Sequence, residues 1–135
     1  MSVAINDLKG MTPEISKQLK ALGIANNELL VQAAKSPEER KALAAKVGIE
    51  TRALLELANR ADLSRVKGVA GVYSDLLEQA GVDTVKELAG RRPDNLHAKM
   101  VEVNKEKNLT GRLPTSEMVE SWVAQAKELP KFLTY

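Results

Sequence analysis

Hydrophobic residues recur every three or four positions along most of the chain, a spacing typical of amphipathic helices, and no stretch alternates as a strand would. Residues that favour helix N-termini precede these runs, and glycine or proline closes them. The predicted starts are Thr12-Pro13, Ser36-Pro37, Thr51, Gly71, Thr84, Pro93 and Thr115. The predicted stops are Gly23, Gly48, Gly81 and Pro130. The pattern therefore predicts an all-α fold of roughly eight to ten helices, several so short that only packing can stabilise them.

Two of the glycines stand where a left-handed helix C-cap belongs. Gly23 and Gly81 each follow a predicted helix whose apolar face ends just before the glycine. Ile24 and Val82 come next and can make the hydrophobic contact that accompanies this kind of cap. We therefore expect a positive φ at both glycines.

The order of glycine, proline and apolar residues indicates an internal duplication. Leu8-Lys9-Gly10-Met11 aligns with Val66-Lys67-Gly68-Val69 at an offset of 58 residues, and Leu57 aligns with Trp122 at an offset of 65. Identity is low, but corresponding positions agree in kind and in order. We therefore divide the chain into two diverged copies, residues 1–61 and 62–129, followed by an apolar tail, residues 130–135. We expect the copies to pack on each other in one compact domain.

The repeated unit resembles the helix-hairpin-helix family. The matching stretches are Leu8-Lys9-Gly10-Met11-Thr12-Pro13 with Leu22-Gly23-Ile24, and Val66-Lys67-Gly68-Val69-Ala70-Gly71 with Ala80-Gly81-Val82. The chain as a whole is similar to a family of uncharacterised bacterial tandem helix-hairpin-helix proteins, of the domain-of-unknown-function 4332 type. The features that carry this similarity are Asn59-Arg60-Ala61-Asp62-Leu63, Asn95-Leu96-His97-Ala98-Lys99 and the final Thr134-Tyr135. The resemblance implies the fold and assigns no activity.

The resemblance also implies a way of binding nucleic acid. In helix-hairpin-helix proteins that bind DNA, the hairpin glycines let backbone amides approach a phosphate, and the dipole of the following helix assists. Such contacts hold the backbone and do not read the bases. Candidate residues for weak, sequence-independent binding are Lys9, Gly10, Thr12, Lys67, Gly68, Ala70 and Gly71, with Arg91 and Arg92 as flanking cations.

Two features favour an alternative, a protein-interaction or assembly module that has lost phosphate binding. The second hairpin glycine is replaced by Thr12 in one copy and by Ala70 in the other, which adds a Cβ between amide and phosphate. The net charge is only +2. Residues 1–61 carry nine basic and seven acidic residues, and residues 62–135 carry eleven of each, so neither half is strongly basic. We keep both interpretations open.

Catalysis is not expected from this composition. The chain has no cysteine and one histidine, His97, so a thiolate metal site, a cysteine nucleophile and any histidine-based triad other than one through His97 are excluded. Glu38, Glu39 and Asp62 fall at predicted helix starts, where carboxylates favour the helix dipole. No secretory signal or membrane-spanning run is visible. We expect a cytoplasmic, non-enzymatic protein with no cofactor, no metal, no membrane association and no small-molecule ligand.

The tail concentrates apolar side chains. It holds Phe132, Leu133 and Tyr135, including two of the chain's four aromatic residues. A loose terminus seldom carries such residues so close together. These three residues are therefore candidates either for packing back over the core or for an interface with another subunit or partner.

Overall fold

The computed structural model describes residues 2–69 and 71–135, and Ala70 of the predicted phosphate set lies outside the described residues. Over those ranges the chain forms eight α-helices and one 3-10 helix, with a single isolated bridge between Ala4 and Asn26. In order, the elements are η1 (Ile5–Asp7), α1 (Pro13–Ala21), α2 (Asn27–Ala33), α3 (Pro37–Val47), α4 (Thr51–Leu63), α5 (Val72–Gln79), α6 (Val85–Ala89), α7 (Pro93–Lys107) and α8 (Ser116–Glu128). The expected all-α fold is confirmed.

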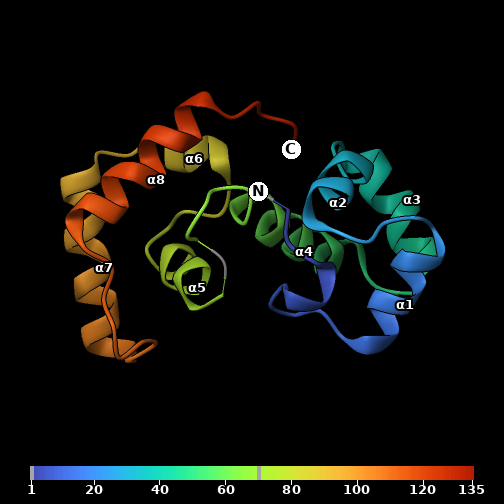
Figure 1. The fold of residues 1–135 in the computed structure, drawn as a ribbon. Helices are drawn as coiled ribbons and strands as arrows, with labels where there is room; N and C mark the ends of the chain where they lie inside the picture. Colours follow the sequence, from blue (N-terminus) through green and yellow to red (C-terminus); the bar gives the residue numbers. More distant parts are fainter. Residues whose placement is uncertain (1, 70) are drawn as a thin grey trace.

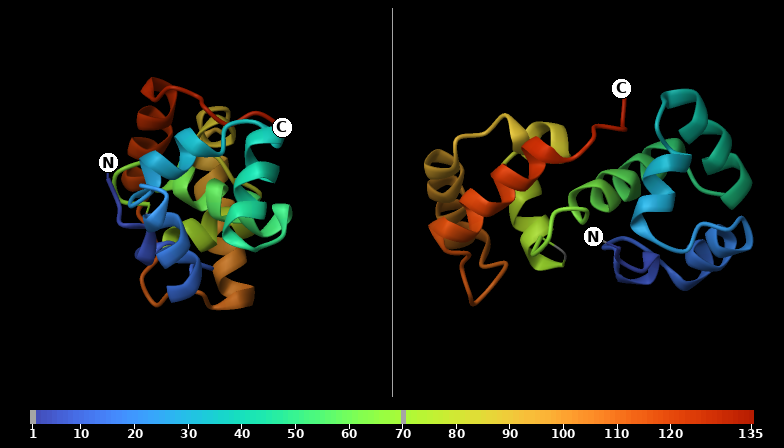
Figure 2. Two further views of the ribbon diagram at one scale, coloured as in Figure 1. Left: turned by 90° about the vertical axis from the view of Figure 1, so that its right-hand side faces the viewer. Right: turned by 45° about the horizontal axis from the view of Figure 1, so that its top comes forward.

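The helices gather in two halves. Figures 1 and 2 show η1 and α1–α4, the first half, beside α5–α8, the second half, with the chain after α8 running back toward α2 and α3. Each half encloses its own hydrophobic cluster. The first is built around Leu19, Leu30 and Leu54, and the second around Met100 and Trp122. The described residues thus form two hydrophobic clusters within one compact domain.

Side-chain caps explain where most helices begin. At five helix starts, the side-chain oxygen of the N-cap residue accepts a hydrogen bond from the amide three residues later, at 2.9–3.2 Å. The N-cap residues are Thr12, Asn26, Ser36, Thr84 and Thr115. Each bond satisfies a donor that the first helical turn would otherwise leave open. Four of these starts were predicted, and the start of α2 at Asn26 was not.

Gly23 and Gly81 close α1 and α5 as expected. Their φ angles are +83° and +93°. After α1, the amide of Ile24 donates to the Leu19 carbonyl at 3.0 Å. After α5, the amide of Val82 donates to the Leu77 carbonyl at 2.9 Å. These six-residue closures are Schellman motifs, which confirms both predicted C-caps.

Asp62 corrects one sequence expectation. It does not stand at the start of a helix but in the last turn of α4, where it is buried. One carboxylate oxygen accepts from the Val85 amide at 2.8 Å, and the other from Arg65 at 2.8 Å. The carboxylate therefore caps the N-terminus of α6, a different helix in the other half. The favourable dipole interaction that we expected does form, but through space rather than along the chain.

Candidate nucleic-acid and protein interface

The two glycine turns have the same backbone form. Gly10 and Gly68 have φ angles of +88° and +95°, a region where glycine alone is unstrained. In each turn the residue after the glycine donates its amide to the carbonyl two residues before it, Met11 to Leu8 at 3.1 Å and Val69 to Val66 at 3.2 Å. The turns are therefore matched in geometry as well as in sequence.

Both turn glycines also lie against a side chain from the last helix of their own half. A Cβ built on Gly10 would lie 3.6 Å from Leu57 of α4. A Cβ on Gly68 would lie 3.1 Å from the Trp122 indole nitrogen of α8. Leu57 and Trp122 are the residues that the repeat alignment pairs. Close approach of Trp122 is thus a second reason for glycine at position 68, whereas the distance at Gly10 is an ordinary van der Waals contact.

Beyond the glycine the two turns diverge. Thr12 has an extended backbone with φ −111°, so this position needs no glycine and the side chain is unstrained. In the second turn Gly71, with φ +74°, is the N-cap of α5 and provides no side-chain cap. The Thr12 side-chain oxygen instead accepts a hydrogen bond from the Ile15 amide in the first turn of α1.

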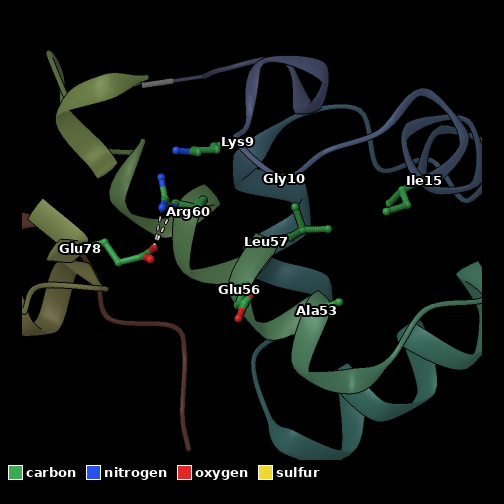
Figure 3. Close-up of a pocket in the computed structure, with 8 residues that line it drawn as sticks. All are labelled: Lys9, Gly10, Ile15, Ala53, Glu56, Leu57, Arg60 and Glu78. Atoms are coloured by element: carbon green, nitrogen blue, oxygen red, sulfur yellow. Dashed lines mark hydrogen bonds and ion pairs between the residues drawn. The ribbon is translucent and has the colours of Figure 1, made fainter. Parts of the chain in front are cut away.

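Lys9 of the first turn is held by a carboxylate from the other half. Its ammonium lies 2.7 Å from Asp75 of α5, with the Lys9 side chain 59% exposed and that of Asp75 13% exposed. Asp75 also pairs with Arg60 of α4, whose guanidinium reaches Glu78 of α5 at 2.6 Å. Figure 3 shows the Lys9 and Arg60 side chains close together, with Glu78 linked to Arg60. The halves are thus joined here by ion pairs.

The recess beside this cluster is lined by equal numbers of carboxylates and cations. It encloses about 280 Å³ and is lined by Lys9, Gly10, Ile15, Ala53, Glu56, Leu57, Arg60 and Glu78. Its two carboxylates, Glu56 and Glu78, face Lys9 and Arg60, and both of these cations also pair with Asp75. Burial and then the Glu78 carboxylate raise the pKa of nearby Asp83, against the opposing effect of Arg60. The ion pairs of Lys9 and Arg60 therefore leave no excess of positive charge in the recess for an anion.

In the second turn, a glutamine of α8 bonds the backbone of the residue before the glycine. The Lys67 amide donates to Gln125 Oε1 of α8 at 2.9 Å, and the Lys67 carbonyl accepts from Gln125 Nε2 at 3.3 Å. The Lys67 side chain itself is exposed. One amide of the turn is therefore already bonded within the protein.

The two flanking arginines also have partners. The Arg91 guanidinium donates to the carbonyls of Ala80 at 3.2 Å and Gly81 at 3.3 Å, so it caps the C-terminus of α5. Arg92 pairs with Asp94 at 3.1 Å on an exposed surface. Arg91 thus has a structural role, and Arg92 is the more accessible of the two.

His97 connects α7 to the loop that follows it. Its Nε2 lies 2.9 Å from the Pro114 carbonyl, and the side chain is partly buried. Within residues 2–69 and 71–135, no group of three or more His, Cys, Asp or Glu side chains is arranged to hold a metal ion. In the same ranges, no helix has the length and apolar character needed to cross a membrane.

The three tail candidates lie on the first half. Leu133 is 8% exposed and belongs to the first hydrophobic cluster, and Phe132 packs against that cluster. Tyr135 is 65% exposed, but its hydroxyl donates to Asn59 of α4 at 2.7 Å. The tail of the second half therefore completes the core of the first.

The residues that hold these groups in place were not predicted. Lys9 and Asp75 are 66 positions apart, and Lys67 and Gln125 are 58 apart, so no local pattern pairs them. Asp75 stands in the first turn of α5, where a carboxylate is expected for the helix dipole alone. Only the three-dimensional arrangement shows that it also neutralises two cations.

The folded chain is an all-α protein with two glycine-turn halves. A family model described as "Domain of unknown function (DUF4332)" matches residues 9–129, and the chain belongs to this family. No curated protein and no solved structure matches the chain.

Proposed function

We propose that the chain is a non-catalytic tandem helix-hairpin-helix module that binds another protein and no longer binds nucleic-acid backbone. The matched positive-φ turns at Gly10 and Gly68, each just before a helix and each packed on a paired residue of its half, support the helix-hairpin-helix assignment. The choice of partner depends on what surrounds those turns.

The observation that carries the proposal is the position of Asp75. Its carboxylate already neutralises Lys9, the cation of the first turn. It also pairs with Arg60, which Glu78 contacts as well. A phosphate at this turn would have to displace a carboxylate whose side chain is 13% exposed, and would leave Asp75 with Arg60 as its remaining cationic partner. The loss of a partner is costly for a polar group that is largely shielded from water. In the second turn, the Lys67 amide similarly has a partner within the protein, because it donates to the Gln125 side chain.

A second candidate, weak binding of nucleic-acid backbone, is favoured by one observation. The Lys67 side chain is exposed beside a positive-φ glycine, and Arg92 is exposed as well. An exposed ion pair such as Arg92–Asp94 is weak, so Arg92 could exchange its partner for a phosphate. These cations could hold a duplex loosely and without sequence preference.

An anisotropy titration with a labelled DNA duplex at low salt tests the proposal. The parent chain is expected to show no binding. Asp75→Asn frees Lys9 and Arg60 from the carboxylate, so binding seen only in this variant would support the proposed role of Asp75 directly. Binding by the parent chain would overturn the proposal in favour of the second candidate.

A further inference from the structure

The tail crosses from one half of the molecule to the other. Residues 130–135, the strap, leave the end of α8 in an extended conformation that begins at Leu129. Figures 1 and 2 show this segment running from α8 toward α2 and α3 of the first half. The strap therefore occupies a surface of the first half as a short peptide would.

The first half holds the strap by its backbone. The Thr134 amide donates to the Lys35 carbonyl at 2.7 Å, and the Thr134 carbonyl accepts from Arg40 at 2.7 Å. Arg40 is only 3% exposed and is fixed by bonds to the carbonyls of Ala34 at 2.9 Å and Lys35 at 3.0 Å. Both backbone polar groups of Thr134 are thus satisfied, a form of recognition open to any residue, and the Thr134 hydroxyl adds a bond to the Lys35 carbonyl at 3.1 Å.

Side-chain recognition comes from one aliphatic anchor and two aromatic rings. Leu133 inserts into the first hydrophobic cluster. The Arg65 guanidinium lies 4.8 Å from the centre of the Phe132 ring, and the Arg40 guanidinium lies 5.3 Å from the centre of the Tyr135 ring. Cations over ring faces favour aromatic residues at these two positions. The contacts define a pattern of aromatic, Leu, any residue, aromatic.

The strap does not fill the surface that it occupies. A recess of about 290 Å³ lies beside Phe132. Val31 and Gln32 of α2, together with Leu129 and Phe132, form much of its lining. A larger aromatic group than Phe132 would bury more apolar surface here. A segment with a larger ring at the position of Phe132 could therefore bury more apolar surface than the strap does.

We propose that the surface under the strap, which includes Val31 of α2, Arg40 of α3 and Asn59 of α4, is a docking site for an extended segment of a partner protein with the pattern aromatic, Leu, any residue, aromatic, and that the strap occupies the site until such a segment displaces it. The inference rests on the proposed protein-binding function and gives that function a site and a partner chemistry. The strap competes at an effective concentration on the order of millimolar, so it holds the site closed against weakly matching segments.

A labelled peptide with the sequence of residues 129–135 tests this in trans. In the full-length chain, Leu133→Asp places a charge in an apolar cluster and should release the strap. This variant is expected to bind the peptide at least about tenfold more tightly than the parent, because the competing strap is gone. Leu113→Asp, the same change at an exposed leucine, is the matched control and should bind like the parent. Circular dichroism checks that each variant is folded.

Two altered peptides make the test specific to the surface under the strap. A peptide with the Leu133→Asp change should not bind the released chain, because it lacks the anchor. A peptide with Phe132→Trp should bind more tightly than the native sequence, because the larger ring reaches into the recess. If the strap-released chain is folded and does not bind the native peptide, the proposal is wrong.

The absence of cysteine allows a second measurement on the closed form. In the parent background, Lys35→Cys with Thr134→Cys should cross-link within one chain, because these residues are bonded through their backbones. Covalent dimers instead would show that a second copy, not a partner protein, is the occupant, and would overturn the proposal. Neither peptide binding nor cross-linking depends on DNA, so failure here is distinguishable from failure of the proposed function.

Discussion

The Lys9 ammonium at the first glycine turn lies 2.7 Å from the Asp75 carboxylate of α5, which belongs to the other half of the chain. The same carboxylate pairs with Arg60, so one acidic side chain both neutralises the turn and connects the halves. Since the apolar clusters of the halves are separate, this polar contact has two roles. It holds the two halves together, and it pairs with Lys9, the cation that a phosphate would contact.

Replacing Asp75 by Asn should destabilise the fold. Arg60 is 11% exposed and would lose one of its carboxylate partners, and a poorly solvated group left short of partners costs about 1–3 kcal/mol. Urea denaturation measures the free energy of unfolding. Asp94→Asn removes the partner of Arg92 in a pair that is largely exposed, and should change stability by less than about 0.5 kcal/mol. Equal effects for the two variants would contradict a structural role for Asp75.

Replacing Gly81 by Val should be more harmful than replacing Gly23 by Val. Both changes force a β-branched residue to a positive φ and should cost roughly 1–2 kcal/mol or more. At Gly81 the new Cβ would also lie 2.9 Å from the Arg91 guanidinium and displace the cap that Arg91 provides, whereas the space at Gly23 is open. Thermal melts give the order, with Gly111→Val as a control outside the left-handed region. Two variants as stable as the parent would refute the C-cap assignment.

Removing residues 131–135 should lower the melting temperature by several degrees. Leu133 leaves the first cluster and Arg40 loses the Thr134 carbonyl, a loss of about 1–2 kcal/mol, which corresponds to such a shift in a chain of this size. Differential scanning calorimetry measures the shift, and sedimentation measures the mass. If truncation leaves the melting temperature unchanged but dissociates an oligomer, the tail is an intermolecular interface instead.

The ionisation of Tyr135 should report whether the strap is docked. Partial burial, followed by the Asp62 carboxylate, raises the pKa of Tyr135 to about 12. Because the pKa is raised in the folded chain, neutral Tyr135 contributes stability fully below a pH of about 10, and this contribution is lost as pH rises through about 12. In a Tyr73→Phe background, absorbance titration follows Tyr135 alone. Adding Leu133→Asp should return its pKa toward about 10, and an unchanged titration would contradict docking of the strap.

The sequence was sufficient to predict elements whose signals are local. Thr12, Ser36, Thr84 and Thr115 begin helices because their side chains bond amides only three residues away. The start of α2 at Asn26 uses the same chemistry and could have been predicted, since its side-chain oxygen accepts from the Leu29 amide.

Contacts between residues distant in sequence could not be predicted in this way. Arg40 meets Thr134 across 94 positions, and Lys9 meets Asp75 across 66. Neither pairing leaves a periodic or spacing pattern. Asp62 shows the same limit, because its carboxylate caps a helix that begins 23 residues later in the chain. The sequence therefore identified the candidate residues, but not the residues that pair with them in the fold.

The most direct test of the central claim is a salt series of anisotropy titrations with duplexes of different sequence. If the turns are occupied within the protein as described, the parent chain shows no binding at about 50 mM salt. If both turns instead held phosphates through two to four contacts, binding would be micromolar or weaker and would fall roughly 10- to 150-fold between about 50 and 200 mM salt. Such binding, equal for all duplexes and abolished by the double change Lys9→Glu and Lys67→Glu in a folded chain, would contradict the account.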